Sequence, residues 1–379
     1  MRVVTCLPRL NNYTDRLRMF AELSHHVDEL HLLTTEYSPE VGSLVAGFNR
    51  LNVIEFPREQ FNRHAFDWIA PRLNRGQLDL VHDNFGHLAS VFQAFTPERS
   101  RTYRFVTTLY TNNWGWFQRV RSRHLDFGWR YVAQRLITLW RDRRICKTAD
   151  RIFVLGPGHE YDLKDAHDLE LTRVTWIPSE VNTSTFTPTK FVPEETPTLL
   201  FTGAVCRNKG IDILLKAMAE LKHRDFQLKL IGRVLPWEMH WFKSAVENAG
   251  LGDRLCHIPQ VAHREMPTHY QGVWSLVFPS RFEGSPRSVR EALASGIPAL
   301  VSDIPGHRGL DPDGRFLRFV SDFSVSAWRD AIEATLDEPL ENNLERRRTG
   351  ASHMNRAHSL KAVAARLAAE YRAVLETPI

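Results

Sequence analysis

Two acidic side chains in the second half of the sequence stand where they could serve chemistry. Glu283 and Glu291 flank the start of a predicted helix, for which Ser285 is a good N-cap and Pro286 suits the first helical position. Gly296 fits just past the end of that helix. The free N–H groups at such an N-terminus favour an anion. Carboxylates beside this N-terminus would not bind the anion itself, but they could accept hydrogen bonds from hydroxyl groups on either side of it. A diphosphate with a sugar on one side and a ribose on the other would fit this arrangement.

Two cations, Arg207 and Lys209, follow the apolar run Leu199–Thr202 and a glycine turn at Gly203. Arginine can contact a phosphate with two N–H groups, and lysine acts as a point charge. The pair is therefore expected to reach a diphosphate at the Ser285–Arg287 helix start. Both features also have an ordinary interpretation, in which the cations are solvated loop residues and the two acids are a loop residue and an exposed helix residue.

The elements that must position these residues are predicted from short apolar runs that alternate with amphipathic stretches. Most runs are apolar throughout, which is typical of parallel strands covered on both faces. Such alternation predicts doubly wound α/β domains, whose ligands bind beyond the carboxyl ends of the strands. The expected strands are Arg2–Leu7, Glu29–Thr34, Asn52–Phe56, Asp79–His82, Tyr103–Leu109, Arg151–Leu155, Arg173–Ile177, Thr198–Thr202, Gln227–Ile231, Leu255–Ile258, Trp274–Phe278 and Ala299–Ser302.

A proline-rich break at Phe186–Pro197 divides this alternation into two parts. We expect two Rossmann-like domains that face a cleft, residues 1–190 and residues 191–359. A final helix at about Leu360–Leu375 has Ala and Leu at helical spacing. It is expected to cross back to the first domain, so that residues 360–379 belong there.

Composition and charge limit the class of protein. The chain has 379 residues, of which 43% are hydrophobic and 25% charged, as in globular proteins of two or three domains. Its four cysteines lie far apart, without metal-type spacing, and are expected to be reduced and buried. No apolar run is long enough to span a bilayer and no signal peptide is evident, so a cytoplasmic protein is expected. The net charge of +5 permits an anionic partner without naming one.

Several motifs together resemble the GT-B-fold retaining glycosyltransferases of family 4, the glycosyl transferases group 1 type. The most specific match is Phe278-Pro279-Ser280…Glu283-Gly284…Glu291-Ala292-Leu293-Ala294…Gly296-Ile297-Pro298. Good matches follow at Lys209-Gly210-Ile211-Asp212 and Leu228-Lys229-Leu230-Ile231-Gly232. Weaker similarities occur in the first half, and the closing helix looks like the family's C-terminal helix.

The resemblance implies an enzyme that moves a sugar from a nucleoside-diphosphate sugar to an acceptor on the side of the first domain, with retention of configuration and without metal or cofactor. The acceptor stays open among a glycan, a lipid-linked sugar and a small molecule. Glu283 would hold donor-sugar hydroxyls, Glu291 would bind the ribose, and Arg207 with Lys209 would neutralise the diphosphate. The other donor-binding residues that we assign are Gly203, Gly232, Arg233, Val261, Gly284, Ser285, Arg287, Ser288 and Tyr110.

Three positions depart from the family pattern. Ala204 stands where the family usually has arginine, and Pro286 removes a backbone N–H from the sugar-binding loop. Tyr110 stands where many members carry a histidine that faces the donor sugar. These departures keep open a non-catalytic nucleotide-sugar-binding protein. A nucleotide-sugar 2-epimerase of the same fold is the other alternative. A dinucleotide-binding dehydrogenase is disfavoured because no G-x-G-x-x-G follows a predicted strand.

The segment 114–144 is rich in arginine and tryptophan, with eight arginines and two acids. Such a helical patch can lie on an anionic membrane surface, so peripheral contact with the inner face of the membrane is one hypothesis. The alternatives are a polyanion site and a helix pair whose tryptophans pack into the core. No nucleic-acid motif is present, and a nucleic-acid partner is not expected.

Overall fold

The computed structural model describes residues 1–8, 14–84, 102–109, 129–156, 163–164 and 170–377. Contacts divide them into two compact units. The first comprises described residues between Met1 and Glu180 together with the segment from His358, and the second comprises Val181–Ala357. The expected boundary after residue 190 falls in the segment that opens the second unit.

The first unit is built on a parallel sheet of seven described strands in the order β3-β2-β1-β4-β5-β6-β7. Apolar runs form its central strands because both of their faces are covered. The strands are β1 Arg2–Cys6, β2 Glu29–Thr34, β3 Leu51–Glu55, β4 Leu80–Asn84, β5 Arg104–Leu109, β6 Arg151–Val154 and β7 Val174–Trp176. The helices are α1 Thr14–Ser24, α2 Pro39–Ser43, α3 Phe61–Asn74, α6 Trp129–Thr148 and α15 Leu360–Glu376.

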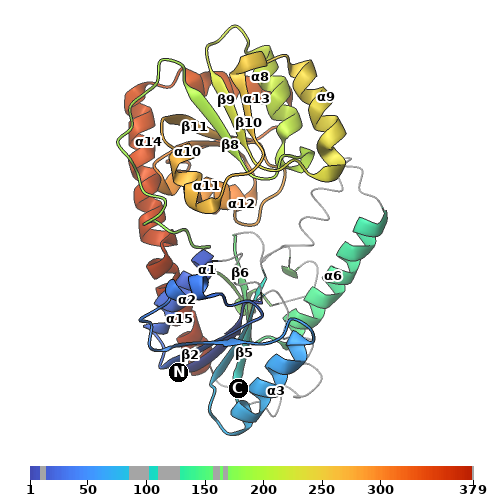
Figure 1. Cartoon of the computed structure of the whole chain (residues 1–379), viewed down its shortest axis with the longest axis vertical. Coiled ribbons are helices and arrows are strands. Elements are labelled where there is room, and N and C mark those ends of the chain that lie inside the picture. Colours follow the sequence, from blue (N-terminus) through green and yellow to red (C-terminus); the bar gives the residue numbers. More distant parts are fainter. Residues whose placement is uncertain (9–13, 85–101, 110–128, 157–162, 165–169, 378–379) are drawn as a thin grey trace. The chain divides into compact units, whose positions relative to one another are not determined.

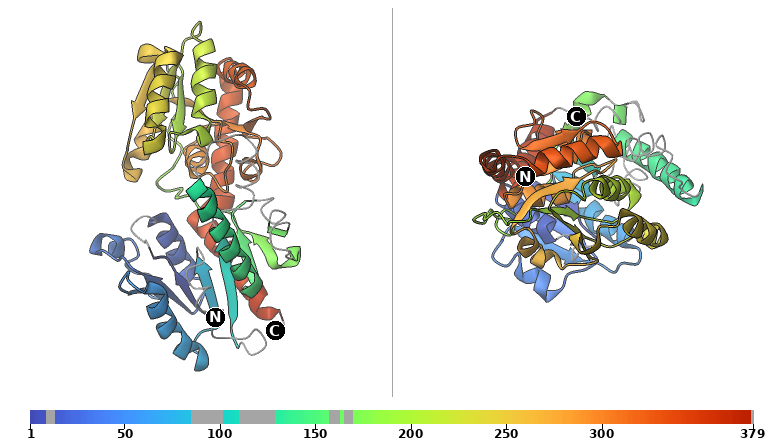
Figure 2. Two further views of the ribbon diagram at one scale, coloured as in Figure 1. Left: turned by 90° about the vertical axis from the view of Figure 1, so that its right-hand side faces the viewer. Right: turned by 90° about the horizontal axis from the view of Figure 1, so that it is seen from above.

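The second unit has a parallel sheet of six described strands in the order β10-β9-β8-β11-β12-β13, with helices on both of its faces (Figure 2). The strands are β8 Thr198–Thr202, β9 Gln227–Ile231, β10 Leu255–Ile258, β11 Val273–Phe278, β12 Ala299–Ser302 and β13 Leu317–Val320. The helices are α8 Ile211–Glu220, α9 Met239–Ala249, α10 Met266–His269, α11 Arg287–Ala294, α12 Pro305–Arg308, α13 Val325–Leu336 and α14 Leu340–His353. Two doubly wound α/β units are thus confirmed.

Two expectations from the sequence are wrong in detail. Strand β13 was not predicted, because the run is short and Arg318 interrupts it. Among the cysteines, Cys6, Cys146 and Cys206 are buried as expected, but Cys256 is exposed.

Helix α15 returns to the first unit, as predicted, and lies along α1 (Figure 1). Val363, Leu367 and Tyr371 of α15 belong to the same buried apolar cluster as Leu17 and Phe20 of α1. Between α14 and α15 the chain makes a π-helical turn at Met354–His358. The core of the first unit is therefore completed by residues that follow the whole second unit in sequence.

A buried histidine joins α15 to the sheet of the first unit. His82 in β4 shares hydrogen bonds with the Tyr371 hydroxyl through Nδ1, at 2.5 Å, and with Thr108 Oγ1 through Nε2, at 2.7 Å. Burial, and secondarily the charge of Arg16, lowers the pKa of His82 to about 3. The folded state thus holds this ring neutral, whereas the unfolded chain takes up a proton at about pH 6.5.

Acid should therefore weaken the first unit. Because the folded pKa of His82 is depressed, its favourable contribution is complete above about pH 6.5 and declines as the pH falls toward 3. Between about pH 7.5 and about pH 5, we expect the free energy of unfolding to drop by about 2 kcal/mol through this group. Urea unfolding at the two pH values measures it. His82→Gln should flatten this dependence and the exposed-site control His26→Gln should not; equal slopes in all three proteins would contradict the assignment.

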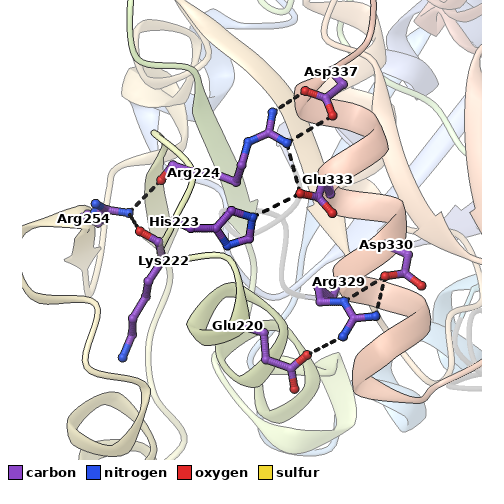
Figure 3. A network of polar contacts seen from close by, with 9 residues as sticks. All are labelled: Glu220, Lys222, His223, Arg224, Arg254, Arg329, Asp330, Glu333 and Asp337. Carbon is purple, nitrogen blue, oxygen red and sulfur yellow. Dashed lines mark hydrogen bonds and ion pairs between the residues drawn. The ribbon is translucent and has the colours of Figure 1, made fainter.

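A network of ion pairs ties α8, α13 and the segment before β9 together (Figure 3). Arg224 Nη1 lies 3.0 Å from Glu333 and 3.1 Å from Asp337, and Arg329 reaches Glu220 at 3.1 Å. Because Arg224 precedes β9, this network lies at the amino ends of the parallel strands. It stabilises helix packing on the edge of the sheet opposite to the one where ligands bind in such folds.

Candidate active site at the carboxyl edge of the second sheet

The order of the strands in the second unit brings two loops together. From β8 the chain proceeds outward to β9 and β10, and from β11 it proceeds the other way to β12 and β13. The carboxyl ends of β8 and β11 are therefore adjacent at a topological switch point, where open α/β sheets bind ligands. The loop after β8 carries Arg207 and Lys209, and the loop after β11 carries Glu283.

Lys209 and Glu283 form an ion pair across this switch point, through Nζ and Oε1. The Lys209 side chain is 23% exposed and that of Glu283 only 10%, so the pair is largely screened from water. The ammonium also lies 5.5 Å from the centre of the Phe278 ring. Close packing holds the two loops: a Cβ on Gly210, which has φ of 75°, would come within 2.1 Å of the Pro279 carbonyl oxygen. The structure thus brings together two residues that lie 74 positions apart in sequence.

Arg281 links the same two loops and was not singled out from the sequence. Its guanidinium makes a bidentate contact with Asp212, with both N–O distances 2.7 Å, and it also donates to the Arg207 carbonyl. Its backbone N–H donates to the Asn208 carbonyl at 3.0 Å. Arg281 therefore fixes the Arg207–Gly210 turn against the loop after β11.

Arg281→Met should loosen this turn. We expect the free energy of unfolding to fall by about 1–3 kcal/mol, because partly buried Asp212 loses a charged partner. Amide exchange in the Arg207–Gly210 turn should also become faster. Arg329→Met is the matched control, since its exposed ion pairs contribute at most about 1 kcal/mol. Unchanged exchange in that turn would show that Arg281 does not hold it.

A cavity of about 460 Å³ opens at the same edge, over the carboxyl ends of β8, β9 and β10. Its lining includes Gly232, where a Cβ would come within 1.8 Å of the Gly203 carbonyl oxygen. Any other residue at position 232 would therefore push apart the loops that follow β8 and β9. The cavity is lined by Thr202, Gly203, Ala204, Ile231, Gly232, Arg233, Pro259, Gln260, Val261, Met266, Ser288 and Glu291. The assigned donor-binding residues Gly203, Gly232, Arg233, Val261, Ser288 and Glu291 are in this set.

Glu291 lies on α11 and is not the exposed helix residue of the ordinary interpretation. Its side chain is only 6% exposed, and Oε1 lies 2.8 Å from His263 Nε2. The Tyr270 hydroxyl lies at a long 3.5 Å from Oε2. Burial, and then the charge of Glu291, raises the pKa of Tyr270 well above its usual value, so the phenol stays protonated. His263 and Tyr270 were not singled out from the sequence.

Arg207 does not share the partner of Lys209. Its Nε lies 3.0 Å from Oε2 of Glu238, a largely buried residue between β9 and α9, and its guanidinium lies 5.7 Å from the centre of the Trp241 ring. The Arg207 side chain remains 39% exposed. The two cations of one turn are thus held by carboxylates from different loops.

The start of α11 corrects one local prediction. The helix begins at Arg287 with Pro286 in the cap position, so Ser285 is not its N-cap. Ser285 Oγ instead accepts a hydrogen bond from Arg290 at 2.5 Å, because the proline occupies the position where a capping side chain would stand. Arg287 is exposed and Gly284 is partly buried beside Glu283. Tyr110 lies outside the described residues.

No group of three or more His, Cys, Asp or Glu side chains in the described part of the chain is placed to hold a metal ion. Within the described ranges, no helix combines the length and apolar character needed to cross a bilayer.

The sequence of this chain is similar to known proteins. A family model described as "Glycosyl transferases group 1" matches residues 184–352. D-inositol 3-phosphate glycosyltransferase of Arthrobacter sp. (strain FB24) is 28% identical over 208 residues, which are 52% of this chain and 49% of that protein. The chain thus matches about half the length of this curated relative.

Solved structures resemble the whole chain in fold. Sucrose-phosphate synthase of Thermosynechococcus elongatus has a TM-score of 0.75 at 19% identity and covers 99% of both chains. Anabaena HepE, solved in complex with UDP and glucose, has a TM-score of 0.72 at 12% identity and covers 98% of this chain and 100% of that one. The fold expected from the motifs, GT-B, is confirmed. The match to the glycosyl transferases group 1 model lies within the second unit.

Proposed function

We propose that this protein is a glycosyltransferase that moves a sugar from a nucleoside-diphosphate sugar to an acceptor that is a glycan, a lipid-linked sugar or a small molecule, with retention of configuration and without a metal ion. The observation that carries the proposal is the Lys209–Glu283 ion pair, at the same sheet edge as the cavity lined by Glu291. A diphosphate seated there has its nucleoside near Glu291 and its sugar near Glu283.

The charges at this edge suit a diphosphate leaving group. The N-terminus of α11, which has no side-chain cap, presents backbone N–H groups, and Lys209 and Arg207 supply positive charge. In the structure, the Lys209 ammonium pairs with the Glu283 carboxylate and neutralises its charge. A diphosphate that attracts the ammonium frees the Glu283 carboxylate to accept hydrogen bonds from sugar hydroxyls. Binding of the phosphates thereby prepares recognition of the sugar.

A panel of UDP-, GDP-, ADP- and dTDP-sugars tests the proposal. The true donor should raise the unfolding temperature in proportion to its occupancy. With an acceptor present, the nucleoside diphosphate should be released and the sugar recovered on the acceptor with the anomeric configuration of the donor. Activity should persist in a metal chelator. If the donor binds but no nucleoside diphosphate is released, the protein is a nucleotide-sugar-binding protein. If the sugar changes its configuration while it stays attached to the nucleotide, the protein is an epimerase.

The proposed acceptor side includes contact with an anionic membrane surface through α6. Leu136, Ile137 and Trp140 are 51%, 68% and 61% exposed, although their side chains are apolar. Arg143 and Arg144 are exposed beside them, and the Arg144 guanidinium lies 4.8 Å from the centre of the Trp140 ring. Apolar groups next to arginines suit the headgroup region of anionic lipid. Residues 114–128 of the predicted patch lie outside the described residues.

Vesicle sedimentation tests this contact. The protein should bind vesicles that contain anionic phosphatidylglycerol and not vesicles of phosphatidylcholine alone. Trp140→Ser with Ile137→Ser should abolish binding without changing the response to the donor. Equal binding of the double variant would exclude α6 as the contact.

A further inference from the structure

We propose that His263 is a positioning residue that aims the Glu291 carboxylate at the ribose hydroxyls of the bound nucleotide. The inference rests on the proposed function and extends it to a residue outside the motifs. His263 begins the short 3-10 turn His263–Glu265, in the loop after β10 that also supplies Pro259, Gln260 and Val261 to the cavity.

The contact with Glu291 has a defined direction. A carboxylate oxygen only accepts, so Nε2 of His263 carries the proton and donates it across 2.8 Å. Glu291 itself is 6% exposed, and few water molecules can reach it to orient or solvate its charge. A charge-assisted hydrogen bond from the imidazole therefore both stabilises the ionised carboxylate and fixes its rotation.

The imidazole is held in turn by aromatic packing. The Phe186 ring lies 5.3 Å from that of His263 and 6.0 Å from that of Tyr270. Tyr270 is protonated and offers Glu291 a second donor, but at 3.5 Å this contact is weak. One strong and one weak donor thus face the carboxylate from the protein side.

The geometry leaves acceptor capacity on the cavity side. A carboxylate has about four acceptor positions, of which the protein uses one strongly and one weakly. Glu291 lines the cavity, so the remaining positions suit a pair of neighbouring hydroxyl groups such as the 2′ and 3′ hydroxyls of ribose. Without His263, the Glu291 carboxylate would lose its fixed direction. Both the affinity for the nucleotide and the preference for ribose over deoxyribose should then decline.

Calorimetric titration with UDP, GDP and ADP, each compared with its 2′-deoxy counterpart, tests this role. For the nucleotide that binds the wild-type protein best, we expect removal of the 2′ hydroxyl to weaken binding about tenfold or more, as for a hydrogen bond to a charged group. In His263→Ala the ribonucleotide should bind about tenfold more weakly, and the penalty for the deoxy form should shrink to about twofold.

Two further variants distinguish the orientation of the Glu291 carboxylate by His263 from a role of His263 in packing alone. His263→Gln offers an amide N–H near the same place and should recover most of the ribose preference. Tyr270→Phe removes only the long contact and should stay close to the wild-type protein in both quantities. A purely structural role would weaken ribo and deoxy forms equally and leave their ratio unchanged.

The outcomes distinguish this inference from the proposed function. If the wild-type protein prefers ribonucleotides and His263→Ala keeps the full preference, the role of His263 is overturned while the proposed function stands. Wild-type binding without any ribose preference also overturns it. If the wild-type protein binds none of the nucleoside diphosphates, the proposed function fails, and this inference with it.

Discussion

Lys209→Met should lower the turnover number of sugar transfer about 30- to 1000-fold, which corresponds to ~2–4 kcal/mol in the barrier. The ammonium is placed at the switch point by Gly210 and by the loop after β11, in a position screened from water. Charge that develops on a leaving diphosphate is stabilised most effectively by such a preplaced cation. The methionine side chain has a length similar to that of lysine but lacks the positive charge. The measurement is nucleoside diphosphate release at saturating donor and acceptor.

Lys216→Met provides the control for this experiment. Lys216 lies on α8, exposed, and its loss should leave turnover unchanged. Wild-type transfer rates in Lys209→Met would remove Lys209 from the mechanism. A loss that appears only in the KM for the donor would assign it to binding and not to the reaction step.

Glu283→Gln should reduce turnover about 100-fold while the affinity for the free nucleoside diphosphate stays within about threefold of wild type. The amide is nearly the same shape, but it cannot neutralise Lys209 and accepts weaker hydrogen bonds from sugar hydroxyls. Turnover and nucleoside diphosphate affinity, measured on the same preparations, test the separation.

Glu291→Ala should show the reverse pattern, with weaker nucleotide binding and a smaller effect on turnover at saturation. If both variants lost nucleotide affinity equally, the assignment of Glu283 to the sugar and Glu291 to the nucleoside would be wrong.

Much of the fold could be predicted because the largely buried strands are visible as short runs rich in apolar residues. Glu29–Thr34, Thr198–Thr202 and Gln227–Ile231 match the structure residue for residue. Strand β13 was missed because it has only four residues and Arg318 interrupts its apolar run. Helix α11 was found, yet its start was misplaced, because Pro286 occupies the cap position that Ser285 was expected to fill.

The candidate site could be predicted only in part. Motif residues such as Glu291 and Gly232 are local signals, and both line the cavity. Their partners are not local: Glu238 holds Arg207, Arg281 holds Asp212, and His263 holds Glu291. Each of these contacts joins residues that lie 28 or more positions apart in sequence, so it depends on strand order and packing, which a single sequence does not display.

The return of α15 to the first unit has a consequence for how the chain is made. A ribosome delivers Val181–Ala357 as one continuous stretch, which can collapse on its own as soon as it emerges. The first unit is translated earlier. Its apolar surface that packs against Val363, Leu367 and Tyr371 stays uncovered until α15 has been synthesised. Although its synthesis begins first, the first unit can therefore complete its core only after the whole second unit has been made.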